Sequence, residues 1–345
     1  MSDINLKKVG AAAEKRALPA AVWPLVALAV ILIIDVIISP SFFSIRVVEG
    51  RLYGSLVDIL YRGTPPALIA MGMAIVIGSR GIDLSVGSVV AMSGAVMAAL
   101  IHGDLSPVII VFGTLGMGLI CGLWNGTLVA VLGIQPIIAT LILMVSGRGI
   151  ALMINGGRIP TFRSEFFEFV STGSIWVIPT RLFLVAFVLL VLWLLLRKTA
   201  FGLFVESVGS NTQAARLSGI GTRVVTLSAY GIVGMCAALA GMVITGDTRS
   251  SDAVYAGVDS ELDAILAVVL GGGSLNGGRI YLGTTLIGVL IIQALTTSIL
   301  MSGLPPEYNK LVKAIVILVV LLLQAPKFRT AVTALFRTGK GKAKS

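Results

Sequence analysis

The most regular feature of the sequence is a succession of long apolar runs separated by short polar segments. A helix needs about 20 predominantly apolar residues to cross the hydrocarbon core of a bilayer. We therefore expect an all-α integral membrane protein with ten transmembrane helices. The predicted helices cover residues 20–38, 66–79, 86–101, 107–132, 136–154, 182–196, 224–246, 262–272, 280–301 and 311–324. The second and the eighth are short, and short, glycine-interrupted segments can be broken helices that line a cavity in transporters.

Composition supports a membrane setting. Of the 345 residues, 57% are hydrophobic and only 12% are charged, whereas a soluble domain carries about 25% charged residues. This apolar excess excludes an ordinary soluble fold and favours contact with lipid. The formal net charge of +10 would suggest nucleic-acid binding in a soluble protein. Here the basic residues lie mainly in the tails and short loops, so membrane topology explains them better, and no nucleic-acid partner is expected.

The distribution of charge predicts how the chain is oriented. With the N-terminus in the cytoplasm and ten spans, the inner segments collect most of the lysines and arginines, and the outer segments collect most of the acids. Positive charge is enriched on the cytoplasmic side, so both termini are expected there. The predicted organisation is a basic tail at 1–19, a membrane domain at 20–324 with a cytoplasmic loop at 197–223, and a second basic tail at 325–345. Two halves of five spans would run in opposite directions, which allows an inverted repeat.

Signals for catalysis are scarce. His102 is the single histidine, which is too few for a metal cluster or a histidine-based triad, and we interpret it as a polar residue at a helix end. The lysine-rich segment 339–342 lacks the G-x-x-x-x-G-K-[ST] spacing of a phosphate loop. We therefore expect a non-catalytic chain that holds no metal or cofactor and cannot hydrolyse ATP by itself.

A glycine-rich polar segment at 78–87 separates the second predicted helix from the third. It places Asp83 and Ser85 just before the third helix. These two residues can form a tight turn that caps that helix. They can equally form a polar cluster at the inner mouth of a transport pathway, and the sequence leaves both interpretations open.

Other polar residues interrupt the apolar runs themselves. Asn125 lies among glycines that recur every four residues over 118–126, a spacing that favours close helix packing, and its side chain can face a neighbouring helix or a pore. Arg148 lies within the fifth predicted helix, where a charge must face protein or water. It can pair with a helix end or a carboxylate, or it can border a cavity. Gln135 precedes the same helix, and Gln293 lies within the ninth.

The predicted cytoplasmic loop at 197–223 is long and patterned. Asn211 or Thr212 can cap a short helix that runs through Leu217, and Gly219 can end it. The helix is amphipathic and is held between two turns. It is either an ordinary connector or a docking element for a cytoplasmic partner.

Three of these segments carry a resemblance to a known family. They are GIDLSVG at 81–87, the loop at 211–220 and GGGSLNGG at 271–278. From about residue 20 to 324 the chain resembles the permease subunits of bacterial pentose and hexose ABC importers, of which the ribose importer permease is the familiar member. Further segments most closely resemble permeases assigned to galactofuranose. These segments are 50–54, 58–60, 135–150, 262–278 and 305–307.

The resemblance implies a permease in the bacterial cytoplasmic (inner) membrane that forms the pathway for a monosaccharide. It implies a second permease, as a homodimer or a related heterodimer, two cytoplasmic ATPase domains that use the ATP, and an extracytoplasmic sugar-binding protein. The residues expected to couple to the ATPase are Glu206, Asn211, Ala214, Ala215, Arg216, Ser218 and Gly219. The candidates for the pathway or its inner mouth are Asp83, Ser85, Asn125, Gln135, Arg148, Asn276 and Gln293.

An ion-coupled secondary sugar transporter is the alternative. Such transporters usually place a titratable or cation-coordinating group near the membrane midplane. Asp35 is the clear carboxylate within a predicted span, and it lies near the outer end of the first. This position favours the ABC permease over the secondary transporter.

Overall fold

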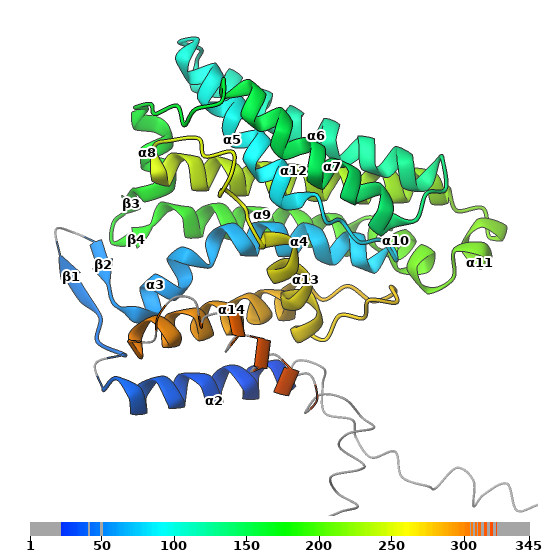
Figure 1. Ribbon diagram of the computed structural model, residues 1–345. Coiled ribbons are helices and arrows are strands. Elements are labelled where there is room, and N and C mark those ends of the chain that lie inside the picture. The colour runs from blue at the N-terminus through cyan, green and yellow to red at the C-terminus, as the bar shows by residue number, and fades with distance from the viewer. Residues whose placement is uncertain are drawn as a thin grey trace, which may run out of the picture.

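The computed structural model describes residues 22–40, 42–48 and 51–303, together with scattered positions between 305 and 322. The two predicted tails and most of the tenth predicted helix lie outside the described residues. Within the described part the chain forms 13 helices and two small two-stranded sheets (Figure 1). The expected all-α class is therefore confirmed in its main part, with four short strands added in the loops.

The helices follow one another with short connections. Their bounds are α2 Val22–Ile38, α3 Ser55–Arg62, α4 Thr64–Gly78, α5 Val86–His102, α6 Pro107–Ala130, α7 Pro136–Ile154, α8 Glu165–Thr172, α9 Thr180–Lys198, α10 Ala200–Ser210, α11 Thr212–Leu217, α12 Thr222–Thr248, α13 Ser260–Leu270 and α14 Leu282–Met301. The strands form two antiparallel hairpins, β1 Arg46–Val48 with β2 Arg51–Tyr53 and β3 Ser174–Ile175 with β4 Ile178–Pro179.

The first nine predicted spans each coincide with a helix, but fewer helices have the length of a full span. By length and composition, five described helices can cross a membrane, namely α6, α7, α9, α12 and α14. A sixth is obtained if α3 and α4, which are bent by 46°, count as one broken span. The eighth predicted span is the 11-residue helix α13, which is about 16 Å long and covers half of a hydrocarbon core. The count of ten therefore stays a prediction.

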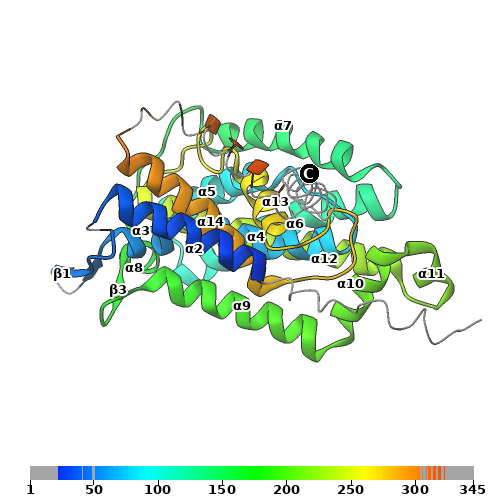
Figure 2. The ribbon, with the colours of Figure 1, turned by 90° about the horizontal axis from the view of Figure 1, so that it is seen from below.

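Helix α12 is the centre of the bundle. It packs against α4, α5 and α6 (Figures 1 and 2). The predicted glycine stripe of α6 lies against it: a side chain at Gly118 would collide with the carbonyl of Gly234, and one at Gly122 would collide with the carbonyl of Tyr230. The two backbones touch, as small residues allow in membrane helices. The interpretation of the stripe as a packing surface is confirmed.

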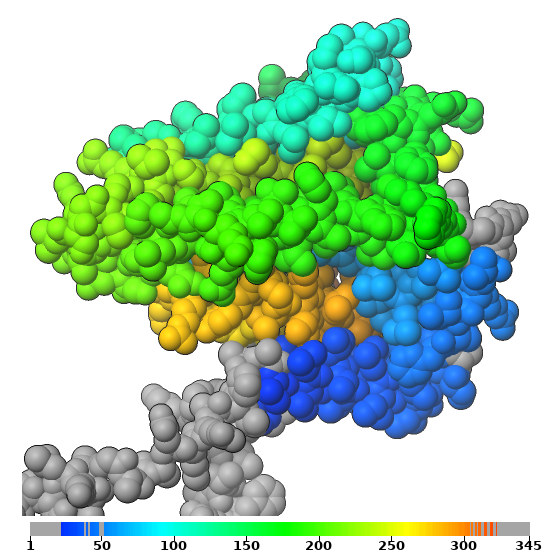
Figure 3. All heavy atoms as spheres, turned by 180° about the vertical axis from the view of Figure 1, so that it is seen from behind, coloured from blue at the N-terminus to red at the C-terminus, as the bar shows by residue number. Residues whose placement is uncertain are grey.

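The remaining helices form the flanks of this core. Seen from behind, the segment from α8 to α10 (green) crosses the molecule between α6 on one side and α14 with α2 on the other (Figure 3). Helix α2 packs on α14, and α7 packs on α5. Both hairpins lie at the same end of the bundle, and α10 and α11 lie at the opposite end (Figure 1).

Candidate functional site

Asp83, Ser85 and Asn125, which come from two separate segments, form one buried polar cluster. The carboxylate of Asp83 accepts hydrogen bonds from the backbone N–H of Ser85 (2.9 Å) and from its hydroxyl (2.7 Å). The amide of Asn125, from α6, donates to the Ser85 hydroxyl oxygen (2.8 Å) and to the carboxylate of Asp83 (3.3 Å). The hydroxyl of Tyr230, from α12, donates to the carbonyl of Ile82 (3.1 Å). The cluster thus ties the start of α5 to α6 and α12.

The cluster is closed to solvent. Asp83 is 1% exposed, and Ser85 and Asn125 are fully buried. The bond from the Ser85 N–H to Asp83 forms a tight turn before α5, but no side chain caps the helix, because Ser85 is the N-cap residue and makes no side-chain cap hydrogen bond. In this conformation the three side chains position a helix and line no open cavity among the described residues.

Residues 250–259 form a second irregular segment, which folds back into the bundle after α12. Arg148, from α7, holds it with one guanidinium nitrogen (Nη1), which donates to the carbonyls of Ala253 (3.3 Å), Val254 (2.8 Å) and Ala256 (3.2 Å). Arg148 is therefore a structural anchor for a loop in this conformation, with backbone carbonyls as partners in place of the expected helix end or carboxylate.

Residues 250–259 meet the start of α5, which follows the Asp83 segment, inside the bundle. A β-carbon at Gly257 would lie 2.8 Å from the Cβ of Val90, and one at Gly87 would lie 2.6 Å from a carboxylate oxygen of Glu261. Gly241 of α12 packs on the Val90 carbonyl and lies seven residues before the end of α12. The contact between Val90 and α12 is therefore about 10 Å inside that end of the helix. The N-termini of α5 and α13 thus face each other within the bundle.

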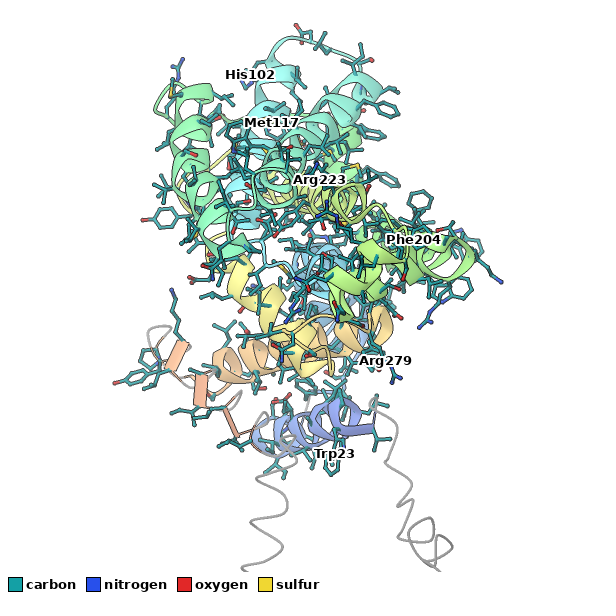
Figure 4. The ribbon with its side chains drawn as sticks, turned by 90° about the vertical axis from the view of Figure 1, so that its right-hand side faces the viewer. Trp23, His102, Met117, Phe204, Arg223 and Arg279 are labelled. Carbon is teal, nitrogen blue, oxygen red and sulfur yellow. The ribbon has the colours of Figure 1, made fainter. Side chains whose placement is uncertain are left out.

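The predicted docking element lies at the end of the bundle that carries α10 and α11. Asn211 caps α11, because its side-chain oxygen accepts a hydrogen bond from the N–H of Ala214 (3.0 Å). The next turn has Gly219 in a left-handed conformation, with φ 83°. The capped helix, and the glycine that ends it, are as predicted. Figure 4 views the molecule from the end that carries α10 and α11.

The apolar residues of α11 do not form one patch. Ala215 is only 5% exposed and packs into the core, whereas Leu217 is 91% exposed. Ala214, Arg216 and Ser218 are exposed as well. A docking partner can therefore reach Leu217 and the exposed residues beside it, but Ala215 faces the interior of the bundle.

Glu206 points inward too. Its carboxylate accepts a hydrogen bond from the N–H of Ile280 (3.2 Å), at the turn before α14. Asn276 is exposed on that turn, Gln135 is exposed before α7, and Gln293 is half-buried in α14. Within the described part of the chain, none of these three forms a hydrogen bond with the Asp83 cluster. The residues that the sequence suggested for the inner mouth of a pathway thus lie in separate parts of the bundle.

An ion pair between a buried arginine and an exposed aspartate at the opposite end was not anticipated. Arg181, at the start of α9, is 2% exposed and pairs with Asp247 of α12 at 3.1 Å. Its guanidinium also donates to the carbonyls of Ser171 (2.7 Å) and Tyr61 (3.1 Å), and lies 3.4 Å from the centre of the Tyr61 ring. An arginine at the start of a long apolar run was the available signal. This group joins α3, α8, α9 and α12.

A family described as the permease component of branched-chain amino acid transport systems matches residues 55–321. The chain belongs to this permease family. The protein is a non-catalytic permease subunit of an ABC sugar importer.

Three curated relatives are import permeases for sugars. The permease is 49% identical over 311 residues to the galactofuranose transporter permease protein YtfT of Escherichia coli K12, covering 89% of this chain and 91% of the relative. It is 36% identical to the fructose import permease protein FruF of Bifidobacterium longum NCC 2705, covering 88% and 87%. It is 36% identical to the ribose import permease protein RbsC of Escherichia coli K12, covering 88% and 93%. No solved structure matches the chain.

Arg148→Ala is expected to lower the amount of folded permease. The change removes the charged donor for three loop carbonyls, and a hydrogen bond to a charged group contributes about 1.5–3 kcal/mol. Fluorescence-detected gel filtration after solubilisation measures the folded yield and its melting temperature. Arg158→Ala, at an exposed arginine just after α7, is the matched control and should leave both unchanged. A normal folded yield combined with an altered sugar preference would move Arg148 from the fold to the pathway.

Proposed function

We propose that this permease imports a galactofuranose-like monosaccharide, with ATP hydrolysed by separate cytoplasmic subunits. The observation that carries the proposal is the 49% identity to a galactofuranose transporter permease over 89% of the chain. The relatives named for ribose and fructose are less similar, at 36%. The proposed assembly contains a second permease, two ATPase domains and a binding protein that delivers the sugar from outside.

We further propose ten spans in a five-plus-five inverted repeat, with both termini in the cytoplasm. Helix α5, of 17 residues, and helix α13, of 11 residues, occupy the third place in the first and second predicted half. Their packing corresponds as well: α12, in the second place of its half, packs on α5, and α4, in the second place of the other half, packs on α13. Interrupted helices at corresponding places of two halves mark the substrate pathway in several transporter folds.

The face that carries α13 and residues 250–259 is the proposed lining of the sugar pathway, opposite a second permease. Irregular backbone at membrane depth is tolerated only where it is buried in protein or lines a water-filled cavity. Along this segment Tyr255 is 76% exposed, and Val254 and Leu262 are about half exposed. Contact with lipid would expose the loop backbone to hydrocarbon. A facing subunit with water between the two satisfies the constraint.

Reconstitution of the full assembly tests the function. We expect vesicles that contain the permease and its ATPase subunits to take up labelled galactofuranose. The binding protein is supplied on the outer side of the permease, and ATP on the cytoplasmic side. Unlabelled ribose and fructose, added as competitors, rank the sugars. Uptake that follows a proton or sodium gradient without ATP would contradict the proposal and favour the secondary transporter.

Leu217→Asp is expected to separate docking from folding. Leu217 is the most exposed apolar side chain of α11, and one charge in the middle of a small interface removes much of its affinity, about tenfold or more. Co-purification of the ATPase subunits measures the loss, while gel filtration of the permease alone should be unchanged. Leu132→Asp, at an exposed leucine of the turn after α6, is the control. Ala215→Glu would disturb the buried side of α11 and would test folding instead.

A further inference from the structure

Helix α10 is fastened at its far end to two turns of the bundle. One is the end of α4 at Gly78, which leads into the Asp83 segment. The other is the turn at 271–279, which follows α13 and leads into α14. The N–H of Gly278 donates to the carbonyl of Gly78 (3.0 Å), so the two turns are also bonded to each other.

Gly209 lies between these turns with no room for a side chain. A β-carbon there would collide with the Gly78 carbonyl and would lie 2.6 Å from the nitrogen of Gly278. On the other side, a β-carbon at Gly277 would lie 2.9 Å from the Gly209 carbonyl. Three backbones thus touch at one point, two residues before the cap of α11.

One turn earlier on α10, Glu206 holds the same neighbour by a directed bond. Its carboxylate accepts the N–H of Ile280 (3.2 Å). Ile280 itself is buried, and its side chain lies against Gly78, where a β-carbon would collide with it. The half-buried Glu206 therefore contacts the permease backbone, although its place in a cytoplasmic loop suggested contact with a partner.

We propose that Glu206 and Gly209 are positioning residues that make α10, the end of α4 and the turn at 271–279 move as one body. This inference rests on the proposed docking of an ATPase subunit at α11. A displacement of α11 is then passed to α5 through the Asp83 segment and to α13 through the turn at 271–279. The two broken helices respond together, which a coupling segment attached to only one of them would not achieve.

The carboxylate of Glu206 allows a clean test, because glutamine retains an acceptor oxygen and methionine does not. We expect Glu206→Met to retain ATPase co-purification and basal hydrolysis, and to lose about tenfold of the stimulation by the sugar-loaded binding protein. Glu206→Gln should stay within about twofold of the wild type, since the same N–H can be bound. Galactofuranose is the sugar used to load the binding protein.

Glycine substitutions give a second, independent arm. Gly209→Ala is expected to reduce stimulated hydrolysis and uptake as Glu206→Met does. Gly221→Ala, at a glycine with open space around it, should have no effect. If Gly209→Ala fails to fold, Glu206→Met alone decides the question.

Each result has a defined meaning. Wild-type assemblies that show no ATP-dependent uptake contradict the proposed function itself. A working wild type with full stimulation in Glu206→Met overturns the positioning role alone. Loss of ATPase binding in Glu206→Met also overturns it, because that result makes Glu206 a contact of the ATPase. Failure of Glu206→Gln to restore stimulation overturns it as well, because the bond to the N–H of Ile280 is then not what couples the segments.

Discussion

Lipid offers no hydrogen-bond partner to a broken helix, so every interruption in a membrane bundle must be satisfied by the protein or by water. This permease has two such interruptions that meet inside the bundle. The first, before α5, is satisfied by the turn between Asp83 and Ser85 and by the amide of Asn125. The second, before α13, is satisfied by the guanidinium of Arg148. Each interruption is held by a polar side chain from a neighbouring long helix, α6 in one case and α7 in the other.

Close backbone packing makes room for these interruptions. Gly118 and Gly122 bring α6 onto α12. This packing places the side chain of Asn125, on the same helix, at the Asp83 turn. Gly87 and Gly257 let the two irregular segments touch. Larger residues at these contacts would separate the helices and leave the polar side chains out of reach of their hydrogen-bond partners.

Much of the local structure followed from the sequence, because it depends on local chemistry. The starts of two long helices, α6 and α7, follow from apolar runs that begin at Pro107 and Pro136. The capping of α11 by Asn211 follows from a short-range hydrogen bond. The packing role of the glycine stripe of α6 followed directly from the sequence, since a spacing of four residues marks one face of a helix.

What escaped prediction depends on contacts between distant segments. Whether Asn125 faced a pore or a neighbour was decided by α5, 40 residues away. The inward side of Ala215 could not be read from a six-residue helix, because its neighbours are set by α10 and α12. The depth of α13 depends on where residues 250–259 fold back, which Arg148 determines. Arg181 and Asp247 lie 66 positions apart in the sequence, and no local pattern links them.

Docking, coupling and the pathway all depend on the proposed orientation, in which α10 and α11 lie on the cytoplasmic face and both hairpins lie outside. Thiol labelling of single-cysteine variants in intact cells tests it most directly, and the background is low because Cys121 and Cys236 are buried. An impermeant maleimide should label Ser174→Cys in intact cells and Ser210→Cys only in inside-out vesicles. Labelling of Ser210→Cys from the outer side of intact cells would contradict the account.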